Sequence, residues 1–230
     1  MKFWKNDKEL FALAKNELNT ALIGDILDQL GYYHQFLSPN LKPLNQDMLL
    51  IGRAMPVLEA DIESDPGKSK VSCVTGKPFG LMFEALDNLK EDEVYICTGA
   101  SSNYALWGEL MSTRAIKLSA AGAVVNGYSR DTFGIIRLNF PTFSLGTYSK
   151  DQKLRGEVIE FGKSISWDGI RIDPGTIIFG DRDGVLVIPK KTEQEVFSGA
   201  IAKARAERKV LNALKRGMTT VDAFDQYGVM

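Results

Sequence analysis

Two polar residues that directly follow a short apolar stretch give the strongest indication of chemistry in this sequence. In AAGAVVNGYSRDT, residues 120–132, an apolar strand ends at Asn126 and Gly127, and Arg130 and Asp131 follow at once. The guanidinium of an arginine presents a planar fork of donors that matches a carboxylate. An aspartate supplies the oxygen ligands that Mg²⁺ or Mn²⁺ prefers. The pair is therefore a candidate site for a carboxylate and a divalent cation, with an ordinary turn that carries a surface ion pair as the alternative.

A second candidate lies upstream, in TGASSNYALWGELMSTRAIKL, residues 98–118. A strand ends near Thr98, and Gly108, Glu109 and Leu110 fall in the opening turn of the helix that follows. Free backbone N–H groups and the helix dipole favour an anion at such a turn. Glu109 is a candidate general base or acid that hydrogen-bonds a metal-held water. The alternative is a carboxylate that only stabilises the helix dipole.

The elements around these residues alternate between strand and helix, which predicts a mixed α/β layer with parallel crossovers. The expected elements are a helix over 79–89, a strand over 93–98, a helix over 106–121, a strand over 123–127, a helix over 132–138 and a strand over 140–145. In such sheets ligands bind outside the carboxyl ends of the strands. Both candidate motifs follow strand ends, so we expect them to face one crevice.

The flanking segments complete the expected architecture. They are two helices between Asp7 and Gly31, a strand from Met48 to Ala60 that is irregular around Gly52 and Pro56, a polar loop over 61–76, short strands over 156–189, a long helix from Glu193 to about Arg216 and a last short helix. Asn19 and Thr20 can cap the second helix, and Gly31 is a natural helix stop. No linker or internal repeat stands out, so residues 1–230 are predicted to form a single domain.

Composition excludes several classes of function. Among 230 residues, Lys plus Arg total 28 and Asp plus Glu total 29, so no positive excess offsets repulsion from a phosphate backbone and no nucleic-acid partner is expected. The two cysteines, Cys73 and Cys97, lack metal-ligand spacing, and such sparse use of cysteine favours a reducing compartment over a disulfide scaffold. His34 is the only histidine, which leaves little for a histidine zinc site or a catalytic triad. Asp181 and Asp183 are expected to satisfy backbone donors in a turn.

The N-terminal sequence MKFWKNDKEL is interrupted by charges and has no apolar core for a signal peptide. No apolar run approaches the roughly 20 residues that a membrane span needs. We therefore expect a cytoplasmic protein with no membrane partner.

Four motifs in a fixed order carry a resemblance to a known family. WGELM, AAGAVVNGYSRDT, FPTFSLG and PGTIIFGDRDGVLVIP together resemble the RraA-like family, over most of the chain from Thr20 onward. That family includes 4-hydroxy-4-methyl-2-oxoglutarate aldolases, 4-carboxy-4-hydroxy-2-oxoadipate aldolases and regulators of ribonuclease E activity. Many members once carried a dimethylmenaquinone methyltransferase label, but no glycine-rich loop of the kind that holds S-adenosylmethionine is recognisable here. The resemblance implies a three-layer β/β/α swivelling-type α/β fold with a long C-terminal helix, assembled as trimers or hexamers.

The resemblance also implies roles for individual residues. Arg130 would bind the carboxylate of a pyruvyl group, Asp131 would ligate Mg²⁺ or Mn²⁺, and Glu109 would contact the metal through water. The turn that contains Gly108 would bind the pyruvyl group through the backbone N–H groups of Leu110 and Met111. An acidic residue of a neighbouring subunit would complete the site, with Glu207 the best match and Glu193 and Glu195 as alternatives.

The implied activity is a metal-dependent lyase that cleaves a 4-hydroxy-2-oxo acid to pyruvate and a second carbonyl compound, with oxaloacetate decarboxylation as a companion activity. The small-molecule partner would be a 2-oxo acid. Asn126 stands where many members have Asp, and Tyr128, Ser129 and the segment around Asp151 also depart from the aldolase pattern, so the distal half of the substrate stays open. A non-catalytic, protein-binding regulator of a ribonuclease is the alternative function.

Overall fold

The computed structural model describes residues 3–62 and 75–228. The fold divides into two compact units: one combines the chain's two ends, up to Tyr33 and from Lys191 onward, and the other is His34–Lys190. The sequence predicted a single domain, and the division into two units does not test that prediction. Most of the polar loop predicted over 61–76, including Cys73, lies outside the described residues.

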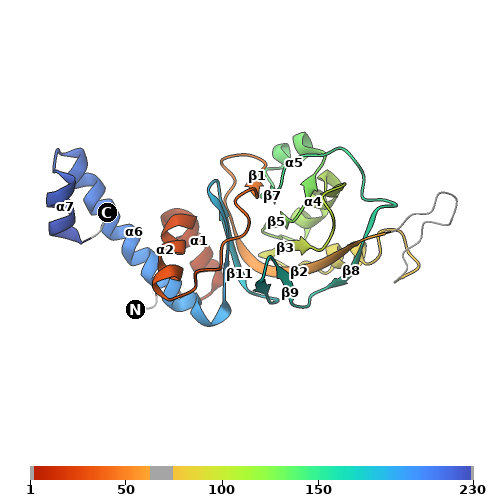
Figure 1. Cartoon of the computed structure of the whole chain (residues 1–230), viewed down its shortest axis with the longest axis horizontal. Coiled ribbons are helices and arrows are strands. Elements are labelled where there is room, and N and C mark those ends of the chain that lie inside the picture. The colour runs from red at the N-terminus through yellow and green to blue at the C-terminus, as the bar shows by residue number, and fades with distance from the viewer. Residues whose placement is uncertain (1–2, 63–74, 229–230) are drawn as a thin grey trace. The chain divides into compact units, whose positions relative to one another are not determined.

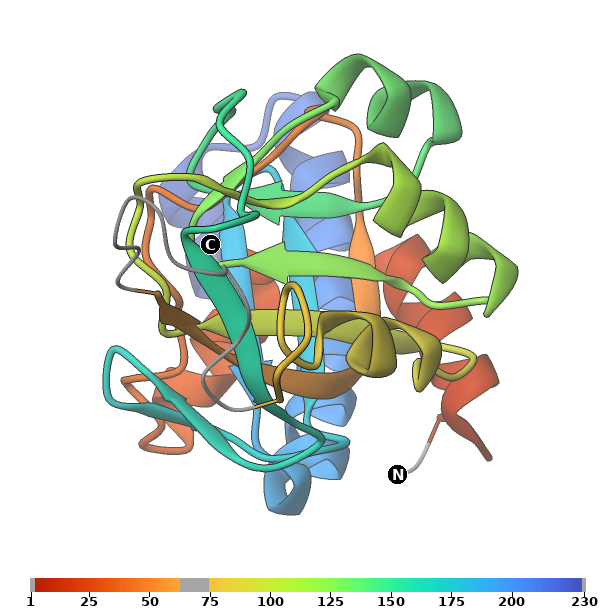
Figure 2. The same ribbon diagram turned by 90° about the vertical axis from the view of Figure 1, so that its right-hand side faces the viewer.

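A mixed eight-stranded sheet forms the centre of the His34–Lys190 unit, in the order β1-β7-β5-β3-β2-β11-β12, with β8 also paired to β2. Its strands are β1 (Lys42–Pro43), β2 (Leu50–Asp61), β3 (Glu93–Thr98), β5 (Gly122–Val125), β7 (Thr142–Ser144), β8 (Gly156–Phe161), β11 (Ile177–Asp181) and β12 (Gly184–Ile188). The strands β2, β3, β5 and β7 are parallel, and Figure 2 shows the arrows of β3, β5 and β7 pointing the same way. The parallel crossovers predicted from the sequence are confirmed.

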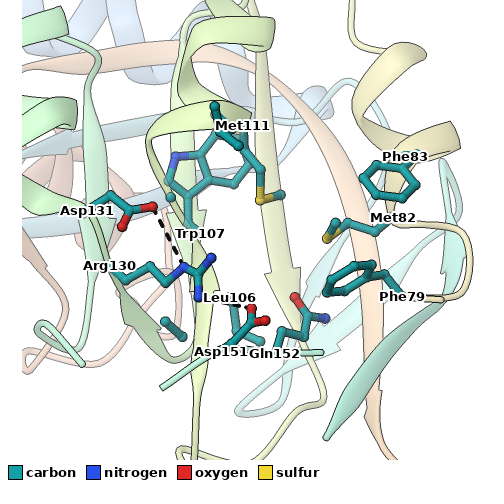
Figure 3. A pocket seen from close by; sticks show the side chains of 13 residues that line it. Phe79, Met82, Phe83, Leu106, Trp107, Met111, Arg130, Asp131, Asp151 and Gln152 are labelled. Carbon is teal, nitrogen blue, oxygen red and sulfur yellow. Dashed lines mark ion pairs between the residues drawn. The ribbon is translucent and has the colours of Figure 1, made fainter. Parts of the chain in front are cut away.

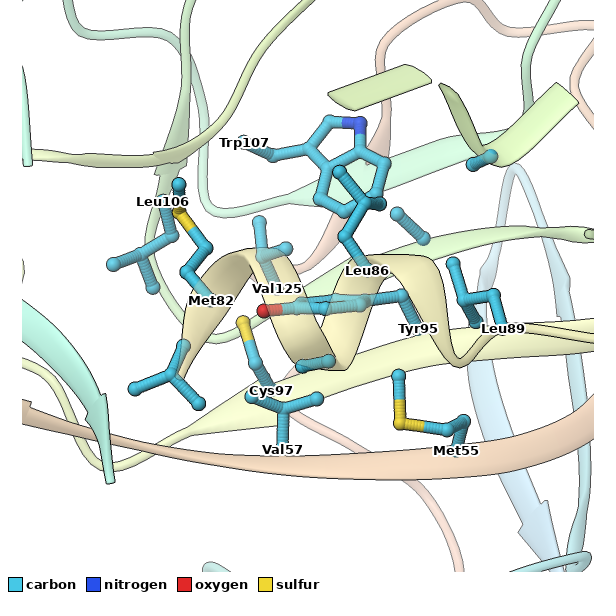
Figure 4. Close-up of a cluster of buried hydrophobic side chains, with 14 of the residues drawn as sticks. Met55, Val57, Met82, Leu86, Leu89, Tyr95, Cys97, Leu106, Trp107 and Val125 are labelled. Carbon is cyan, nitrogen blue, oxygen red and sulfur yellow. The ribbon is translucent and has the colours of Figure 1, made fainter. Parts of the chain in front are cut away.

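Both faces of this sheet are covered, which explains why its strands read as nearly continuous apolar runs. Helices α3 (Met82–Asp87), α4 (Glu109–Lys117) and α5 (Thr132–Leu138) cover one face, and the hairpin of β9 (Ile165–Trp167) and β10 (Ile170–Ile172) covers the other (Figure 1). On the helical face Met82 and Leu86 pack with Val57 and Tyr95 (Figure 4). The three layers are therefore sheet, sheet and helix, and the fold class expected from the sequence is confirmed.

The strand β2 carries side chains alternately to the two faces. Met55 and Val57 join the core under the helices, whereas Leu50 and Ala54 join the core under the hairpin. Its register with β8 shifts between Leu58 and Glu59. The irregularity thus lies after the residues for which the sequence predicted it.

The prediction of a helix over residues 106–121 is wrong for its first residues. Ala105–Trp107 forms a short strand, β4, that pairs in parallel with β6 (Tyr128–Ser129), and the helix α4 begins only at Glu109. Every side chain of β4 is buried, so this stretch lacks the polar positions of an amphipathic helix. The pairing of β4 with β6 brings the two candidate motifs side by side.

The terminal unit is helical. It contains α1 (Asp7–Glu17), α2 (Thr20–Gln29), α6 (Glu193–Lys215) and α7 (Thr220–Tyr227), and a 3-10 turn η1 (Lys190–Thr192) leads into α6. The Asn19 side chain accepts a hydrogen bond from the Leu22 N–H and caps α2, and Gly31 follows α2 with a left-handed φ of 82°. These sequence predictions are confirmed. Over the described residues, no helix has both the length and the apolar character to cross a membrane.

Candidate functional site

A pocket with a cavity volume of about 230 Å³ opens where β4, α4 and the turn after β6 meet. Figure 3 shows charged side chains on one side of this pocket and aromatic and sulfur-containing side chains on the other. The lining residues come from four segments of the chain: Phe79, Met82, Phe83, Ala105, Leu106, Trp107, Gly108, Leu110, Met111, Arg130, Asp131, Asp151 and Gln152. Five residues that the sequence nominated are among them.

Arg130 is fixed in the pocket wall through its backbone. Its N–H donates to the carbonyl oxygen of Trp107 at 2.9 Å, which extends the pairing of β4 with β6. The guanidinium Nη1 lies 3.0 Å from Oδ1 of Asp151, and Nε lies 3.7 Å from Oδ2 of Asp131 (Figure 3). The Arg130 side chain is 38% exposed, so an anion that enters the pocket can reach it.

Asp131 stands at the start of α5 in a left-handed conformation, with φ 56° and ψ 31°. A non-glycine residue rarely adopts this conformation, and such positions cluster at functional sites. The Asp131 carboxylate does not cap the helix. It lies against Gly108 instead, where an added Cβ would stand 2.8 Å from Oδ2. The carboxylate therefore keeps lone pairs available to a ligand.

The start of α4 forms the next part of the wall. Gly108 is the N-cap of this helix, and no side chain caps it. The first N–H groups of an α-helix have no partner within the helix, and they favour an anion. The side chain of Trp107 is held beneath this turn, because its Nε1 donates to Oγ of Ser112 at 2.7 Å. Leu110 and Met111 both line the pocket, as expected.

Glu109 lies close to this wall but does not line the pocket. Its carboxylate rests on Gly134 of α5, where an added Cβ would come within 2.1 Å of the Glu109 Cδ. Oε1 of Glu109 lies 4.0 Å from Nη2 of Arg137. The structure thus brings Glu109 to the contact between α4 and α5, next to the residues that line the pocket.

Glu207 belongs to α6 in the terminal unit, where its Oε1 lies 3.6 Å from Nζ of Lys203. Its contribution from a neighbouring subunit stays a prediction. Asp181 and Asp183 form a local turn, since the Asp183 N–H donates to Oδ1 of Asp181 at 2.9 Å. His34 is exposed.

Sequence reasoning missed three polar residues at this site. Asp151 pairs with Arg130, and Gln152 lines the pocket beside it. Nε2 of Gln152 donates to Oε2 of Glu59 at 2.6 Å, and Oε1 of Glu59 is buried without a partner. Burial raises the pKa of Glu59 to about 8. The acidic side chain of Glu59 within the largely apolar stretch Met55–Ala60 was the available signal.

The carboxylates of one chain do not by themselves form a closed metal cage. Within residues 3–62 and 75–228, no three His, Cys, Asp or Glu side chains are grouped so that they could hold a metal ion. Mg²⁺ is often bound through one or two carboxylates, with water and substrate in the remaining positions. The uncapped carboxylate of Asp131 fits such a site.

The sequence of this chain matches a known protein family. The family model described as RraA-like, Aldolase/RraA, matches residues 20–187. The chain belongs to the RraA-like family. A relative from Legionella pneumophila, protein DlpA, is 33% identical over 91% of this RraA-like chain, which spans only 32% of that relative's length.

Two further comparisons cover both chains more evenly. A protein from Halalkalibacterium halodurans with the provisional name 4-hydroxy-4-methyl-2-oxoglutarate aldolase is 29% identical over 89% of each chain. The crystal structure of RraAS2 from Streptomyces coelicolor, described as an unusual member of the RNase ES inhibitor RraA family, matches with a TM-score of 0.74. It covers 94% of this chain and 100% of RraAS2 at 20% identity, which shows the shared fold alone.

Proposed function

We propose that this RraA-like protein is a lyase that cleaves a carbon–carbon bond next to a 2-oxo acid and releases pyruvate. The observation that supports this most strongly is the convergence of Arg130, Asp131 and the start of α4 on one pocket. A relative that covers most of the chain carries an aldolase name, which agrees with this proposal.

Arg130 and the start of α4 act on the same end of the substrate. The guanidinium binds the substrate carboxylate through its fork of donors. The N–H groups of Leu110 and Met111 hold the adjoining oxygen atoms. Cleavage leaves an electron pair on the pyruvyl fragment as an enolate. Fixed positive groups at this end stabilise the charge as it develops, without reorganising during the reaction.

Asp131 is the residue that we propose to hold a divalent cation, Mg²⁺ or Mn²⁺. When bound, the cation supplies a Lewis acid that polarises the 2-oxo group. Glu207 of a neighbouring subunit would add a further acidic group in a homotrimer or hexamer. These assignments, like the cytoplasmic location, remain predictions.

Glu109 is the proposed general base for the 4-hydroxyl proton. Its side chain is 41% exposed and lies beside the pocket rather than within it. A general base can act through one intervening water, so this position is compatible with the role. Oxaloacetate decarboxylation would produce the same enolate, and we include it in the proposed activity.

The experiment is a pyruvate-release assay on a set of 4-hydroxy-2-oxo acids and oxaloacetate, with Mg²⁺ or Mn²⁺ and with EDTA. We expect turnover with metal, loss of turnover with EDTA and recovery when metal is restored. Equal turnover in EDTA would contradict the metal dependence, and no pyruvate from any substrate would contradict the lyase.

The fold shared with RraAS2 keeps the ribonuclease regulator as the second candidate. A binding assay against the endoribonuclease separates the two. Inhibition of the ribonuclease without pyruvate release would favour the regulator.

A further inference from the structure

The side of the pocket opposite Arg130 is apolar. Phe79, Met82 and Phe83 stand across the cavity from Arg130 and Asp131, and Met111 and Leu106 extend this surface between them (Figure 3). Gln152 lies between the two sides. The pocket therefore offers one charged end and one hydrocarbon end to a single ligand.

Phe79 is presented to the pocket by an unusual backbone. Its φ is 64°, and Gly80 follows with φ 64°. A Cβ on Gly80 would stand 2.3 Å from the carbonyl oxygen of Val158, so the chain approaches β8 closely here. The Val158 N–H donates to the carbonyl oxygen of Phe79 at 3.1 Å, which fixes the turn. A bulky residue held in a left-handed conformation is a rare arrangement that points to a functional constraint.

Phe83 completes an aromatic pair at this end. The rings of Phe79 and Phe83 meet edge to face, with centroids 5.7 Å apart. Phe83 is nevertheless 54% exposed. An apolar ligand group placed against this pair would remove that hydrocarbon surface from water, and each buried CH₂ group strengthens binding about fourfold.

A second carboxylate on the ligand would meet unfavourable surroundings at this end. It would lose hydration against hydrocarbon side chains that cannot donate a hydrogen bond. Asp151, which also lines the pocket, carries a charge of the same sign as such a carboxylate. The only cationic side chain among the residues that line this pocket is Arg130, and the proposed function assigns it to the 2-oxo acid end.

We propose that the substrate is a 4-hydroxy-2-oxo acid with a single carboxylate and an alkyl or aryl group on its distal carbon. This inference rests on the proposed lyase function and differs from a dicarboxylate such as 4-hydroxy-4-methyl-2-oxoglutarate. In the reaction the bond between C3 and C4 breaks and its electron pair goes to C3. The 4-hydroxyl proton passes to the base, C4 becomes the carbonyl of an apolar aldehyde or ketone, and protonation of C3 gives pyruvate.

The first test compares ligands that carry no 4-hydroxyl group and cannot be cleaved. Calorimetry with the wild-type protein and Mg²⁺ measures the binding of 2-oxo-4-phenylbutanoate and of 2-oxoglutarate. We expect the phenyl compound to bind at least about tenfold more tightly, since several apolar carbons are buried at about fourfold each. Equal binding, or tighter binding of 2-oxoglutarate, would overturn the inference even where pyruvate release is found.

The second test measures kcat/KM for the corresponding 4-hydroxy compounds in variants. Phe83→Ala should reduce the preference for the phenyl substrate about tenfold, and Phe83→Lys should reverse it toward the dicarboxylate. Phe224→Ala is the matched control, because Phe224 on α7 is 55% exposed and does not line the pocket. An unchanged preference in both Phe83 variants would refute the substrate class. If no substrate releases pyruvate, the lyase proposal fails, and the calorimetric comparison still decides the ligand preference.

Discussion

At the scale of single residues, Glu59 is the most unusual group near the pocket. It stands on β2 with a relative exposure of 2%, and its only hydrogen-bond donor among the described side chains is Gln152. Desolvation disfavours its charged form, so burial raises its pKa from 4.5 to about 8. At neutral pH the group is therefore mostly protonated. A neutral carboxyl can accept from Gln152 without placing a buried charge behind the pocket.

This state of Glu59 makes stability depend on pH. Between about pH 4.5 and 8 the folded protein binds more protons at Glu59 than the unfolded chain does, so the free energy of unfolding falls as pH rises through this window. The slope approaches about 1.4 kcal/mol per pH unit. Glu59→Gln keeps the acceptor for Gln152 and cannot ionise. We measure the free energy of unfolding by urea denaturation at pH 6 and pH 8. Between these two pH values the wild type should lose more stability than Glu59→Gln. An equal change in both proteins would argue against a protonated Glu59.

At the scale of elements, the starts of α4 and α5 interlock through two glycines. The carboxylate of Asp131 occupies the space over Gly108, and the carboxylate of Glu109 occupies the space over Gly134. Each carboxylate thus fits in its position because the residue that it lies against is a glycine and has no side chain. This arrangement lets two acidic residues approach neighbouring helix N-termini, where the dipole favours negative charge.

Gly134→Ala tests the second half of this arrangement. The new Cβ would meet the end of the Glu109 side chain, which must move, whereas alanine favours the helix by up to about 1 kcal/mol over glycine. We expect an unchanged or raised Tm and a fall in kcat of about tenfold or more. Gly184→Ala is the control, since a Cβ there has no neighbour within 4 Å. Full activity in Gly134→Ala would show that the position of Glu109 is unimportant.

The length of an element decided whether it could be predicted from the sequence. The parallel strands β2 and β3 and the helix α5 were predictable because their apolar patterns run over several residues, as in Glu93–Thr98 and Thr132–Leu138. The strands β4 and β6 span three and two residues, too few for a periodic pattern. The sequence marked the segment around Asp151 only as a departure from the aldolase pattern, because tertiary packing alone brings Asp151 and Gln152 to Arg130.

At the scale of the whole molecule, all residues that line the pocket belong to the His34–Lys190 unit. The pocket draws on the turn before α3, the start of α4, the turn after β6 and the turn before β8. The start of α4 and the turn after β6 directly follow the parallel strands β4 and β6, and the turn before β8 directly precedes that strand. Such placement at strand ends is where ligands bind in open α/β sheets. The proposed activity therefore depends on Asp131 and Arg130 acting together at one strand end.

The most direct test of this claim is pyruvate release by Asp131→Asn. Asparagine tolerates the left-handed backbone of this position and keeps the shape of the side chain, but it lacks the charge that holds a cation. Asp168→Asn is the matched control, because Asp168 also has a positive φ, 50°, and does not line the pocket. We expect at least a hundredfold loss of metal-dependent kcat/KM in Asp131→Asn at an unchanged Tm, with wild-type activity in the control. Wild-type turnover in Asp131→Asn would contradict the account.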